Sequence, residues 1–401
     1  MLDVLILNTA VADFRGHEFA FVSDLTGPGG VARCSLEDMP SYTQKQYRSW
    51  IDQGRANAGG SGNSAPLMAK AGIHTGVAAN LGKGEYGGLD AQGRFFFDEL
   101  AQRGIDMSPS RVHPSLPTGT AFIYEADQSE RAGIAYFPNA NDDFNFDDFR
   151  QTIVTQRPKV VYYMYSGLSQ RGDANEGRDL AEFMGWCRRQ GALTIVDSHT
   201  LAGDPRSLID RGGTVEQYNL LRPVLAEADL FFTSYDEARL IHNTLARPRR
   251  WEESTVGENI GHFLEFVRDR FWQEAGRTRL FGVTVKDGAY HLEMGPDGSC
   301  RGPRKTESMF QGGRVVDLTG AGDSFRAGLI SYTATYSDEF RKGTLPFDEA
   351  IQMGNLFAGL YVTAPLGDRY RHIVSFDRML DIVRRGREFG SFENLLQMLR
   401  E

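Results

Sequence analysis

Short strand-like runs alternate with longer segments of helical period over roughly residues 157–365, and this alternation limits the possible folds more than any other feature. The runs KVVYYMYSG, ALTIVDSH, ADLFFTSY and LFGVTVKDG are short and apolar, as buried strands are. Between them, RDLAEFMGWCRRQG and NIGHFLEFVRDRFWQEAG carry apolar residues every three or four positions and end at glycine, which is typical of helices. The pattern therefore predicts βα units around a largely parallel central sheet.

The first third of the chain predicts an antiparallel hairpin within a small sheet beside the main one. Two strand-like runs, TGTAFIYEA and AGIAYFP, flank the polar stretch DQSER as the arms of a hairpin do. We place the strands of this appendage, which could act as a lid, at roughly residues 1–20 and 117–138. Residues 16–56 and 246–258 lack a clear period and are interpreted as insertions or linkers. A chain of 401 residues can build one large α/β core, and we expect a single domain over residues 1–401.

The composition narrows the classes of partner. A net charge of -9 gives no basic footprint for nucleic acid or an anionic membrane. No apolar run approaches the ~20 residues that span a bilayer, and the first residues lack the pattern of a signal peptide. The three cysteines lie far apart without metal-type spacing, which suits a reducing compartment. We expect a cytoplasmic protein whose partners are small molecules.

The stretch VVDLTGAGDSFRAGLI, residues 315–330, predicts a strand that ends at Asp317, a glycine turn, and a helix from Ser324. At such a junction the unpaired amides and the positive end of the helix dipole point at one place, where an anion is stabilised. A carboxylate beside that place, Asp323, could accept a proton from an attacking hydroxyl. A simpler interpretation is equally compatible with this stretch alone: Asp323 or Ser324 caps the helix and the glycines only make the turn.

A rival motif lies at residues 82–87, where GKGEYG matches the GxGxxG pattern of dinucleotide sites, with Asp106 about twenty residues further on. The match is weak evidence because it is internal to the chain and no convincing second strand follows Asp106. The sequence contains no GxxxxGK[ST], HExxH or GxSxG, so the P-loop, zincin and hydrolase motifs are absent.

Two glycine motifs together resemble those of the PfkB, or ribokinase-like, family of carbohydrate and nucleoside kinases, and the resemblance runs over most of the chain. DLTGAGD at residues 317–323 is similar to the family's DTxGAGD motif, and AGGSGN at residues 58–63 is similar to its early [AG]-G-x-x-x-N motif. ADLFFTSYDEARLI resembles the family's NxxE segment, and VTVKDGAYHL resembles the strand and turn under the ATP phosphates. The resemblance implies an α/β protein with a three-layer α/β/α ribokinase-like fold, a mainly parallel central sheet and a small β-sheet lid.

The resemblance also implies roles at the reacting centre. Asp323 would be the catalytic base, and the amides of Gly320, Ala321 and Gly322 would form an anion hole for the transferring phosphoryl group. On the substrate side, glycines would let the hydroxyls approach the backbone and two polar side chains would hydrogen-bond them. These implied substrate residues are Asp13, Gly59, Gly60 and Asn63.

A third set is implied for the nucleotide and the metal ions. The residues in the family's nucleotide positions are Ser234, Glu237, Thr284, Gly288 and Asn355. Glu237 would help hold Mg²⁺ through water. Asp317, with the backbone near Thr319, matches the place where some family members bind a monovalent cation such as K⁺.

The expected function is ATP-dependent phosphorylation of a hydroxyl, a primary one by preference, on a sugar or sugar-like substrate. A nucleoside kinase of the same family is the alternative, and an apolar floor for a base could come from Phe14, Phe19, Phe21 and Tyr136. A third alternative is a non-catalytic binding or regulatory protein, because Leu318, Ser234 and Lys286 depart from the family pattern. The intact GAG and Asp323 favour catalysis. Lids of this family often pair between subunits, so a homodimer through the lid is expected.

Overall fold

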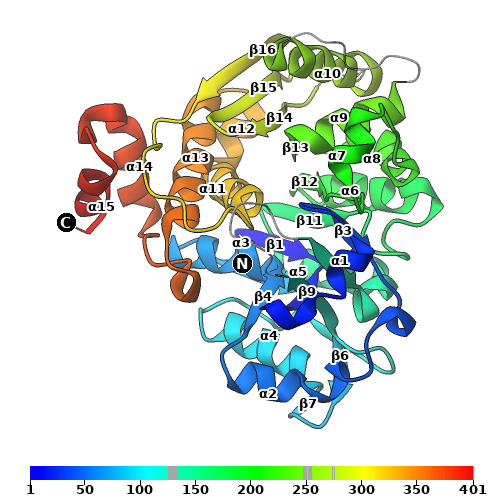
Figure 1. Ribbon diagram of the computed structural model, residues 1–401. Coiled ribbons are helices and arrows are strands. Elements are labelled where there is room, and N and C mark those ends of the chain that lie inside the picture. The colour runs from blue at the N-terminus through cyan, green and yellow to red at the C-terminus, as the bar shows by residue number, and fades with distance from the viewer. Residues whose placement is uncertain (125–132, 247–250, 252–254, 273, 275, 401) are drawn as a thin grey trace.

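The computed structural model describes residues 1–124, 133–246, 251, 255–272, 274 and 276–400 (Figure 1). Its main sheet has eight strands in the order β16-β15-β14-β13-β12-β11-β1-β5. Neighbours from β5 to β14 run parallel, and β15 and β16 add antiparallel at one edge. The strand bounds are β1 Val4–Leu7, β5 Thr75–Ala78, β11 Val160–Ser166, β12 Leu193–Ser198, β13 Leu230–Ser234, β14 Arg279–Val285, β15 Gly288–Met294 and β16 Cys300–Glu307. The predicted, mainly parallel central sheet is confirmed.

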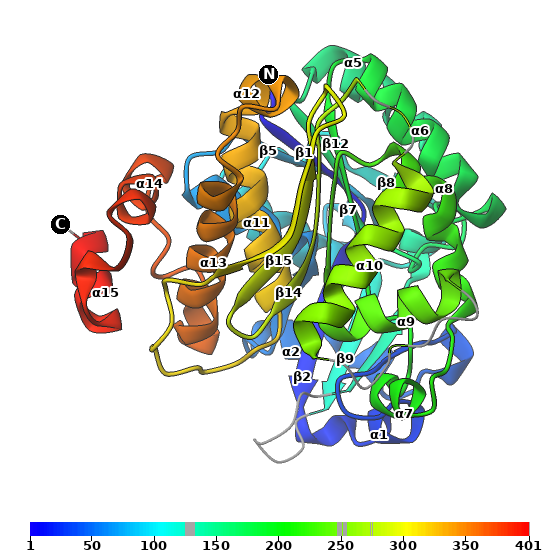
Figure 2. The same cartoon turned by 90° about the horizontal axis from the view of Figure 1, so that it is seen from above.

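Helices cover both faces of this sheet, which confirms the three-layer architecture (Figure 2). One face carries α3 Ser61–Lys70, α11 Ala321–Thr335 and α13 Phe347–Thr363. The other carries α5 Asp147–Gln156, α6 Arg178–Arg189, α8 Leu221–Glu227, α9 Tyr235–Leu245 and α10 Val256–Phe271. Alternate residues of β1 enter the two cores: Val4 and Ile6 pack on the first face, and Leu5 and Leu7 on the second.

Shorter helices complete the chain. Beyond α13, α14 Phe376–Arg385 packs against it and α15 Phe392–Arg400 follows. The remaining helices are α1 Val22–Leu25, α2 Tyr47–Asp52, α4 Ala91–Ala101, α7 Pro205–Asp210 and α12 Ser337–Lys342. No helix in the described ranges combines the length and the apolar character needed to cross a membrane.

The lid is a separate five-stranded sheet with the order β3-β10-β9-β2-β4. Its strands are β2 Ala10–Gly16, β3 Val31–Arg33, β4 Ala56–Gly60, β9 Gly119–Tyr124 and β10 Ile134–Phe137. The expected hairpin is present, since β9 and β10 pair antiparallel, while DQSER lies outside the described residues. The lid begins at β2, because the fully apolar β1 is buried inside the main sheet rather than in the lid. A third sheet contains β6 Asn80–Gly84, β7 Gly88–Leu89 and β8 Arg111–His113.

The segment of residues 17–52 covers the lid face that points away from the main sheet. Ala12 and Phe14 of β2 and Phe122 of β9 point into this cluster, where they meet Phe19, Tyr47 and Trp50. Phe14 lies 5.4 Å from both the Tyr47 and the Trp50 ring, measured between ring centroids. Residues expected to be an insertion therefore form the second layer of the lid.

One predicted strand is wrong. Residues 314–316 form an extended loop, with Val315 51% exposed and Val316 48% exposed, and only the Val316 amide is bonded, to the Val362 carbonyl. The sheet already ends at β16, so these valines have no strand to pair with. The helix after the turn begins at Ala321, three residues earlier than expected, which places Asp323 in its first turn.

Candidate active site

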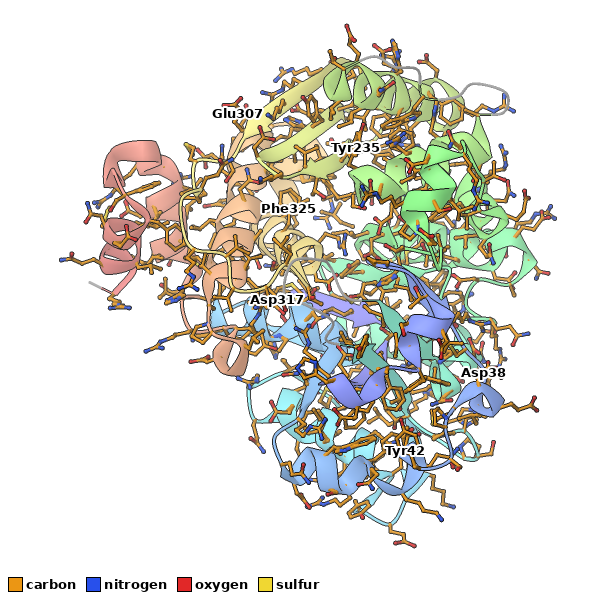
Figure 3. The ribbon with its side chains drawn as sticks, in the orientation of Figure 1. Asp38, Tyr42, Tyr235, Glu307, Asp317 and Phe325 are labelled. Atoms are coloured by element: carbon orange, nitrogen blue, oxygen red, sulfur yellow. The ribbon has the colours of Figure 1, made fainter. Side chains whose placement is uncertain are left out.

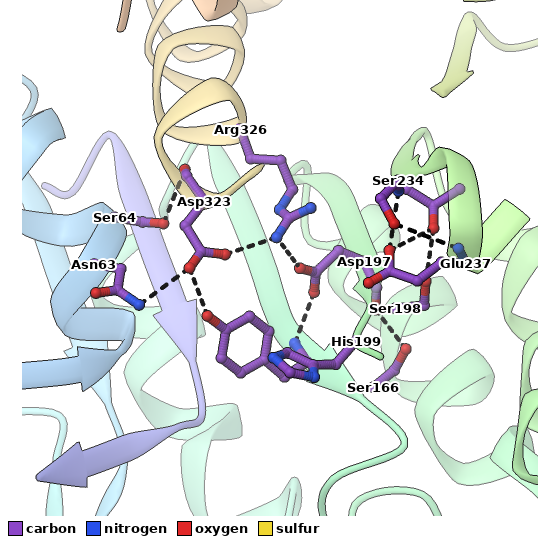
Figure 4. Close-up of polar contacts among 12 residues, drawn as sticks. Asn63, Ser64, Ser166, Asp197, Ser198, His199, Ser234, Glu237, Asp323 and Arg326 are labelled. Atoms are coloured by element: carbon purple, nitrogen blue, oxygen red, sulfur yellow. Dashed lines mark hydrogen bonds and ion pairs between the residues drawn. The ribbon is translucent and has the colours of Figure 1, made fainter. Parts of the chain in front are cut away.

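Asp323 lies in the first turn of α11 and its carboxylate is bonded to residues far away in the chain (Figure 4). Oδ2 accepts hydrogen bonds from the Tyr165 hydroxyl at 2.6 Å and from Asn63 Nδ2 at 3.1 Å. Oδ1 accepts from Arg326 Nη2 at 2.7 Å. Neither Asp323 nor Ser324 caps α11, whose N-cap is Gly320 without a side-chain hydrogen bond. The capping interpretation therefore does not describe this turn.

Arg326 joins Asp323 to a second buried carboxylate, Asp197, at the end of β12. Its Nη2 lies 3.0 Å from Asp197 Oδ2, and the arginine is only 8% exposed. Burial alone would lower the pKa of Arg326, but Asp197 and Asp323 outweigh it and raise that pKa above its ordinary value. The guanidinium is thus a fixed positive charge that faces two buried carboxylates. Burial raises the pKa of Asp197 to about 7, although the charge of Arg326 lowers it in part.

Tyr165 closes the arrangement into a ring. Its amide donates to Asp197 Oδ1 at 2.7 Å, while its hydroxyl reaches Asp323. Tyr165 has a φ of 62°, a left-handed value that costs a bulky residue of the order of 1 kcal/mol or more, and the pairing of β11 with β12 shifts register here. This irregular backbone turns the tyrosine from the sheet toward α11, where its ring packs against His199 with 4.4 Å between ring centroids.

The loop before α11 contains the residues expected to form an anion hole. Gly320 has a φ of 81°, and a Cβ there would lie 2.9 Å from the Tyr361 hydroxyl, so both conformation and space require glycine. The Ala321 amide donates to the Leu318 carbonyl at 3.1 Å. Within the part of the chain that the structure describes, the amides of Gly320 and Gly322 have no acceptor. Two of the three expected amides are therefore free to bind an anion at the positive end of α11.

On the lid side, Asp13, Gly59 and Gly60 lie on the paired strands β2 and β4, and Asn63 follows in α3. A Cβ on Gly59 would lie 2.2 Å from Asp13 Oδ2, so the absence of a side chain makes room for the carboxylate. Burial raises the pKa of Asp13 to about 7, with Arg15 lowering it and Asp323 raising it further. The structure thus brings Asn63 into hydrogen-bond contact with Asp323 and places Asp13 close enough for the Asp323 charge to act on it. Their role in substrate binding stays a prediction.

The expected nucleotide residues are only partly brought together. Ser234 and Glu237 form a capping box at the start of α9, and the Glu237 carboxylate also accepts from Thr200 at 3.0 Å and Thr233 at 2.8 Å. Burial would raise the pKa of Glu237, but the Ser234 amide and the charge of His199 outweigh it and lower that pKa. Oε1 carries only the Thr200 bond, so it can hold one further water of a metal ion. This fits a water-mediated Mg²⁺ contact.

Thr284 lies on β14 beside Thr233, to whose carbonyl it donates at 3.3 Å, and Gly288 opens β15 after a two-residue turn. Asn355 is apart from them, in α13 on the other face of the sheet, where it donates to Gln352 at 3.2 Å. The expected nucleotide residues therefore lie on both faces of the main sheet, near the ends of β13 and β14.

Asp317 lies between the lid and the main sheet (Figure 3). Its Oδ1 accepts from the Thr319 amide and hydroxyl at 3.0 Å each, and its Oδ2 lies 3.2 Å from Arg15 of the lid and 3.8 Å from Arg369. Partial burial would raise the pKa of Asp317, but the Thr319 amide and the Arg15 charge lower it below its usual range. The carboxylate is thus already paired with cations of the chain itself.

The dinucleotide alternative finds no support in the structure. Gly82 and Gly84 belong to β6, and the helix that follows, α4, begins only at Ala91. A Cβ at Gly82 would lie 2.2 Å from Asp90 Oδ2, so this glycine makes room for the N-cap of α4. The GxGxxG pattern is a packing feature here.

Sequence reasoning missed three residues that surround Asp323: Tyr165, Asp197 and Arg326. Two of them carried a usable signal. Asp197 ends an otherwise apolar run, and Arg326 lies in the apolar segment that follows GAGD, so each is a charge predicted to be buried and in need of a partner. Tyr165 carried none, because nothing in KVVYYMYSG distinguishes one tyrosine from the next.

Known proteins agree with this architecture. 2-Dehydro-3-deoxygluconokinase of Bacillus subtilis is 25% identical over 321 residues, which cover 77% of this chain and 81% of that protein. Adenosine kinase of Anopheles gambiae superposes with a TM-score of 0.64 at 16% identity, covering 93% of this chain and 98% of that one. Fructokinase of Xylella fastidiosa, solved with bound ATP, gives 0.63 at 17% identity, covering 96% and 99%.

A family model gives the identification. Residues 40–249 and 289–369 match the model described as pfkB family carbohydrate kinase, which includes both glycine motifs and the segment around Glu237. The chain is a PfkB family carbohydrate kinase.

Proposed function

We propose that this kinase transfers the γ-phosphoryl group of ATP to a hydroxyl of a sugar or sugar acid, with Asp323 as the base. The observation that carries the proposal is a buried carboxylate in the first turn of α11, beside a loop with two free amides. Oδ1 of Asp323 accepts one hydrogen bond, from Arg326, so it keeps a lone pair for the hydroxyl of a substrate.

The transfer follows from these positions. The substrate oxygen attacks the γ-phosphorus, its proton moves to Asp323, and the bond to the bridging oxygen breaks with its electron pair leaving on ADP. The free amides of Gly320 and Gly322 stabilise the charge on the phosphoryl oxygens. Mg²⁺, held through water by Glu237, would neutralise charge on the polyphosphate.

A sugar is favoured over a nucleoside because three of the four aromatic residues expected to form a floor for a base point elsewhere; Tyr136 alone faces the main core, where its hydroxyl accepts a hydrogen bond from Asn141 Nδ2 at 3.2 Å. Phe14 and Phe19 are fully buried in the outer layer of the lid, and Phe21 packs against the same cluster. The inner face of β2 instead presents Asp13 and Arg15. Polar and charged side chains suit polyol and carboxylate groups. The B. subtilis relative, named for a sugar-acid substrate, supports the same choice.

Substitution of Asp323 tests the proposal. We expect Asp323→Asn to lower kcat by about 10²–10⁴-fold, the usual contribution of a general base, and to leave ATP binding intact. The measurement is ADP production from Mg-ATP over pentoses, hexoses, sugar acids and nucleosides, with ATP affinity determined by calorimetry. The matched control is Asp338→Asn, an exposed aspartate of α12. Equal turnover of Asp323→Asn and the control would contradict the assignment, and turnover of nucleosides alone would contradict the substrate class.

A further inference from the structure

The anion-hole loop rests on a buried arginine, Arg369, that comes from beyond the end of α13. Its guanidinium is 8% exposed. Nη2 donates to the Asp317 carbonyl and to the Thr319 carbonyl, at 3.1 Å each, and lies 3.8 Å from the Asp317 carboxylate. Its Cζ lies 4.2 Å from the centroid of the Tyr361 ring, whose hydroxyl in turn lies against Gly320.

The oxygens around Arg369 Nη2 are of the kind that would coordinate a small cation. Backbone carbonyl and carboxylate oxygens are the ligands that hard metal ions take in proteins, and here two carbonyls and one carboxylate converge on one positive group. The other acceptor positions of Asp317 are occupied by Thr319 and Arg15. The residues around Asp317 therefore do not fit the monovalent cation that the family resemblance implies, because side chains of this protein hold the same oxygens.

We propose that Arg369 takes the place of a monovalent cation under the anion-hole loop, so that this kinase works without K⁺. The proposal rests on the proposed function of that loop. An arginine remains charged at every physiological pH and fixes two carbonyls with one planar group, so it can hold the loop permanently where an exchangeable ion would hold it only when bound. Arg369 is thus a positioning residue, which acts on the phosphoryl group through the loop.

The first experiment measures the cation dependence of the wild-type protein. Rates of ADP formation are compared over a series of KCl concentrations, with tetramethylammonium chloride keeping the ionic strength constant. We expect the wild-type rate to change less than about twofold, within what general screening produces. The same series is followed by thermal unfolding with ATP and without it, and no K⁺-specific rise in the midpoint is expected.

Substitution supplies the second experiment. We expect Arg369→Met to lower kcat by at least about tenfold, which is less than the 10²–10³-fold loss typical of removing a direct anion-hole donor. We also expect added K⁺ to restore part of the rate and of the thermal midpoint of this variant. Arg369→Lys keeps the positive charge and replaces the Met variant in this experiment if the Met variant does not fold. The rate and the thermal midpoint of Arg369→Lys should not depend on K⁺. Arg371→Met, two residues further on and exposed, is the matched control.

Either of two outcomes overturns the proposal: K⁺-specific activation or stabilisation of the wild-type protein, or an Arg369→Met variant that responds to K⁺ no more than Arg371→Met does. The thermal measurements need no acceptor. They decide the cation question even if the sugar panel fails, so the two proposals fail independently.

Discussion

Arg326 is the residue on which the geometry of Asp323 depends. Removing one partner of a buried ion pair typically lowers the free energy of unfolding by about 3–5 kcal/mol, because the remaining charge is left without compensation. The buried charge of Arg326 is compensated by two carboxylates, Asp197 and Asp323. The same pairing holds the Asp323 carboxylate in place through Oδ1.

Asp13 gives the site a pH dependence that can be measured. Its pKa of about 7 means that below neutrality the carboxyl is protonated and loses acceptor positions for sugar hydroxyls. We expect kcat/KM of the wild type to fall up to about tenfold per unit below pH 7, and that of Asp13→Asn to be lower and flat there. A pH series of kcat/KM checks this, with Asp24→Asn, an exposed aspartate of α1, as the control.

The same shift has a consequence for stability, and its sign is fixed. The folded pKa lies above the ordinary aspartate pKa of 3.8, so the stabilising contribution is complete below pH 3.8 and is lost as the pH rises through 7. Relative to wild type, Asp13→Asn should gain urea resistance between pH 5 and 8. A constant difference across this range would show that Asp13 does not titrate there.

Among the elements, the lid is held against the main body by its second layer. Thr26 Oγ1 donates to the Gly203 carbonyl at 2.6 Å, the Gly27 amide donates to the same oxygen at 2.8 Å, and the Val31 amide bonds Ala202 at 3.0 Å. These bonds join residues 26–31 to the loop after β12, and His199, the first residue of that loop, packs against Tyr165. Lid position and site geometry are therefore linked.

Removal of one of these bonds should loosen the contact between the lid and the main body. We expect Thr26→Val, which keeps the shape and loses the hydroxyl, to raise the acceptor KM by about fivefold, the equivalent of a hydrogen bond worth ~1 kcal/mol. ATP hydrolysis without acceptor should rise as water enters. Steady-state kinetics with and without the sugar measure both. Ser23→Ala is the control, because the Ser23 hydroxyl donates to the Ala20 carbonyl within its own segment. Equal acceptor KM values and equal ATP hydrolysis rates for the two variants would contradict a role of the Thr26 bond in holding the lid.

Element types were largely predictable from the sequence, and side-chain contacts were not. The strands β11 to β14 and helices α6 and α10 form where periodicity places them, because each is buried on faces that its own apolar pattern defines. The strand expected at residues 314–316 does not form, because the main sheet ends at β16 and offers these residues no strand edge to pair with. The bond of Tyr165 to Asp323 joins residues 158 positions apart, and no local pattern encodes such a contact.

For the whole molecule, the covered lid face predicts the assembly state. The outer face of the lid sheet is buried under residues 17–52 of the same chain, including Trp50 at 5% exposure. That face is not available to a second copy, so we expect a monomer of 44.7 kDa rather than a dimer paired through the lid. Light scattering coupled to size exclusion measures this. A dimer that dissociates on substitution of exposed residues of the lid would contradict it.

The strand order of the main sheet also bears on how the chain is made. From β11 to β16 each new strand is laid beside the one synthesised just before it, so a chain emerging from the ribosome can extend the sheet at a single edge. The lid strands and Gly59, which makes room for Asp13, belong to the first 137 residues, whereas Asp323, the proposed base, arrives only with α11. Translation that stops before residue 323 would yield a protein that contains the lid strands but lacks Asp323, so we expect an incomplete product to have no kinase activity if Asp323 is the base.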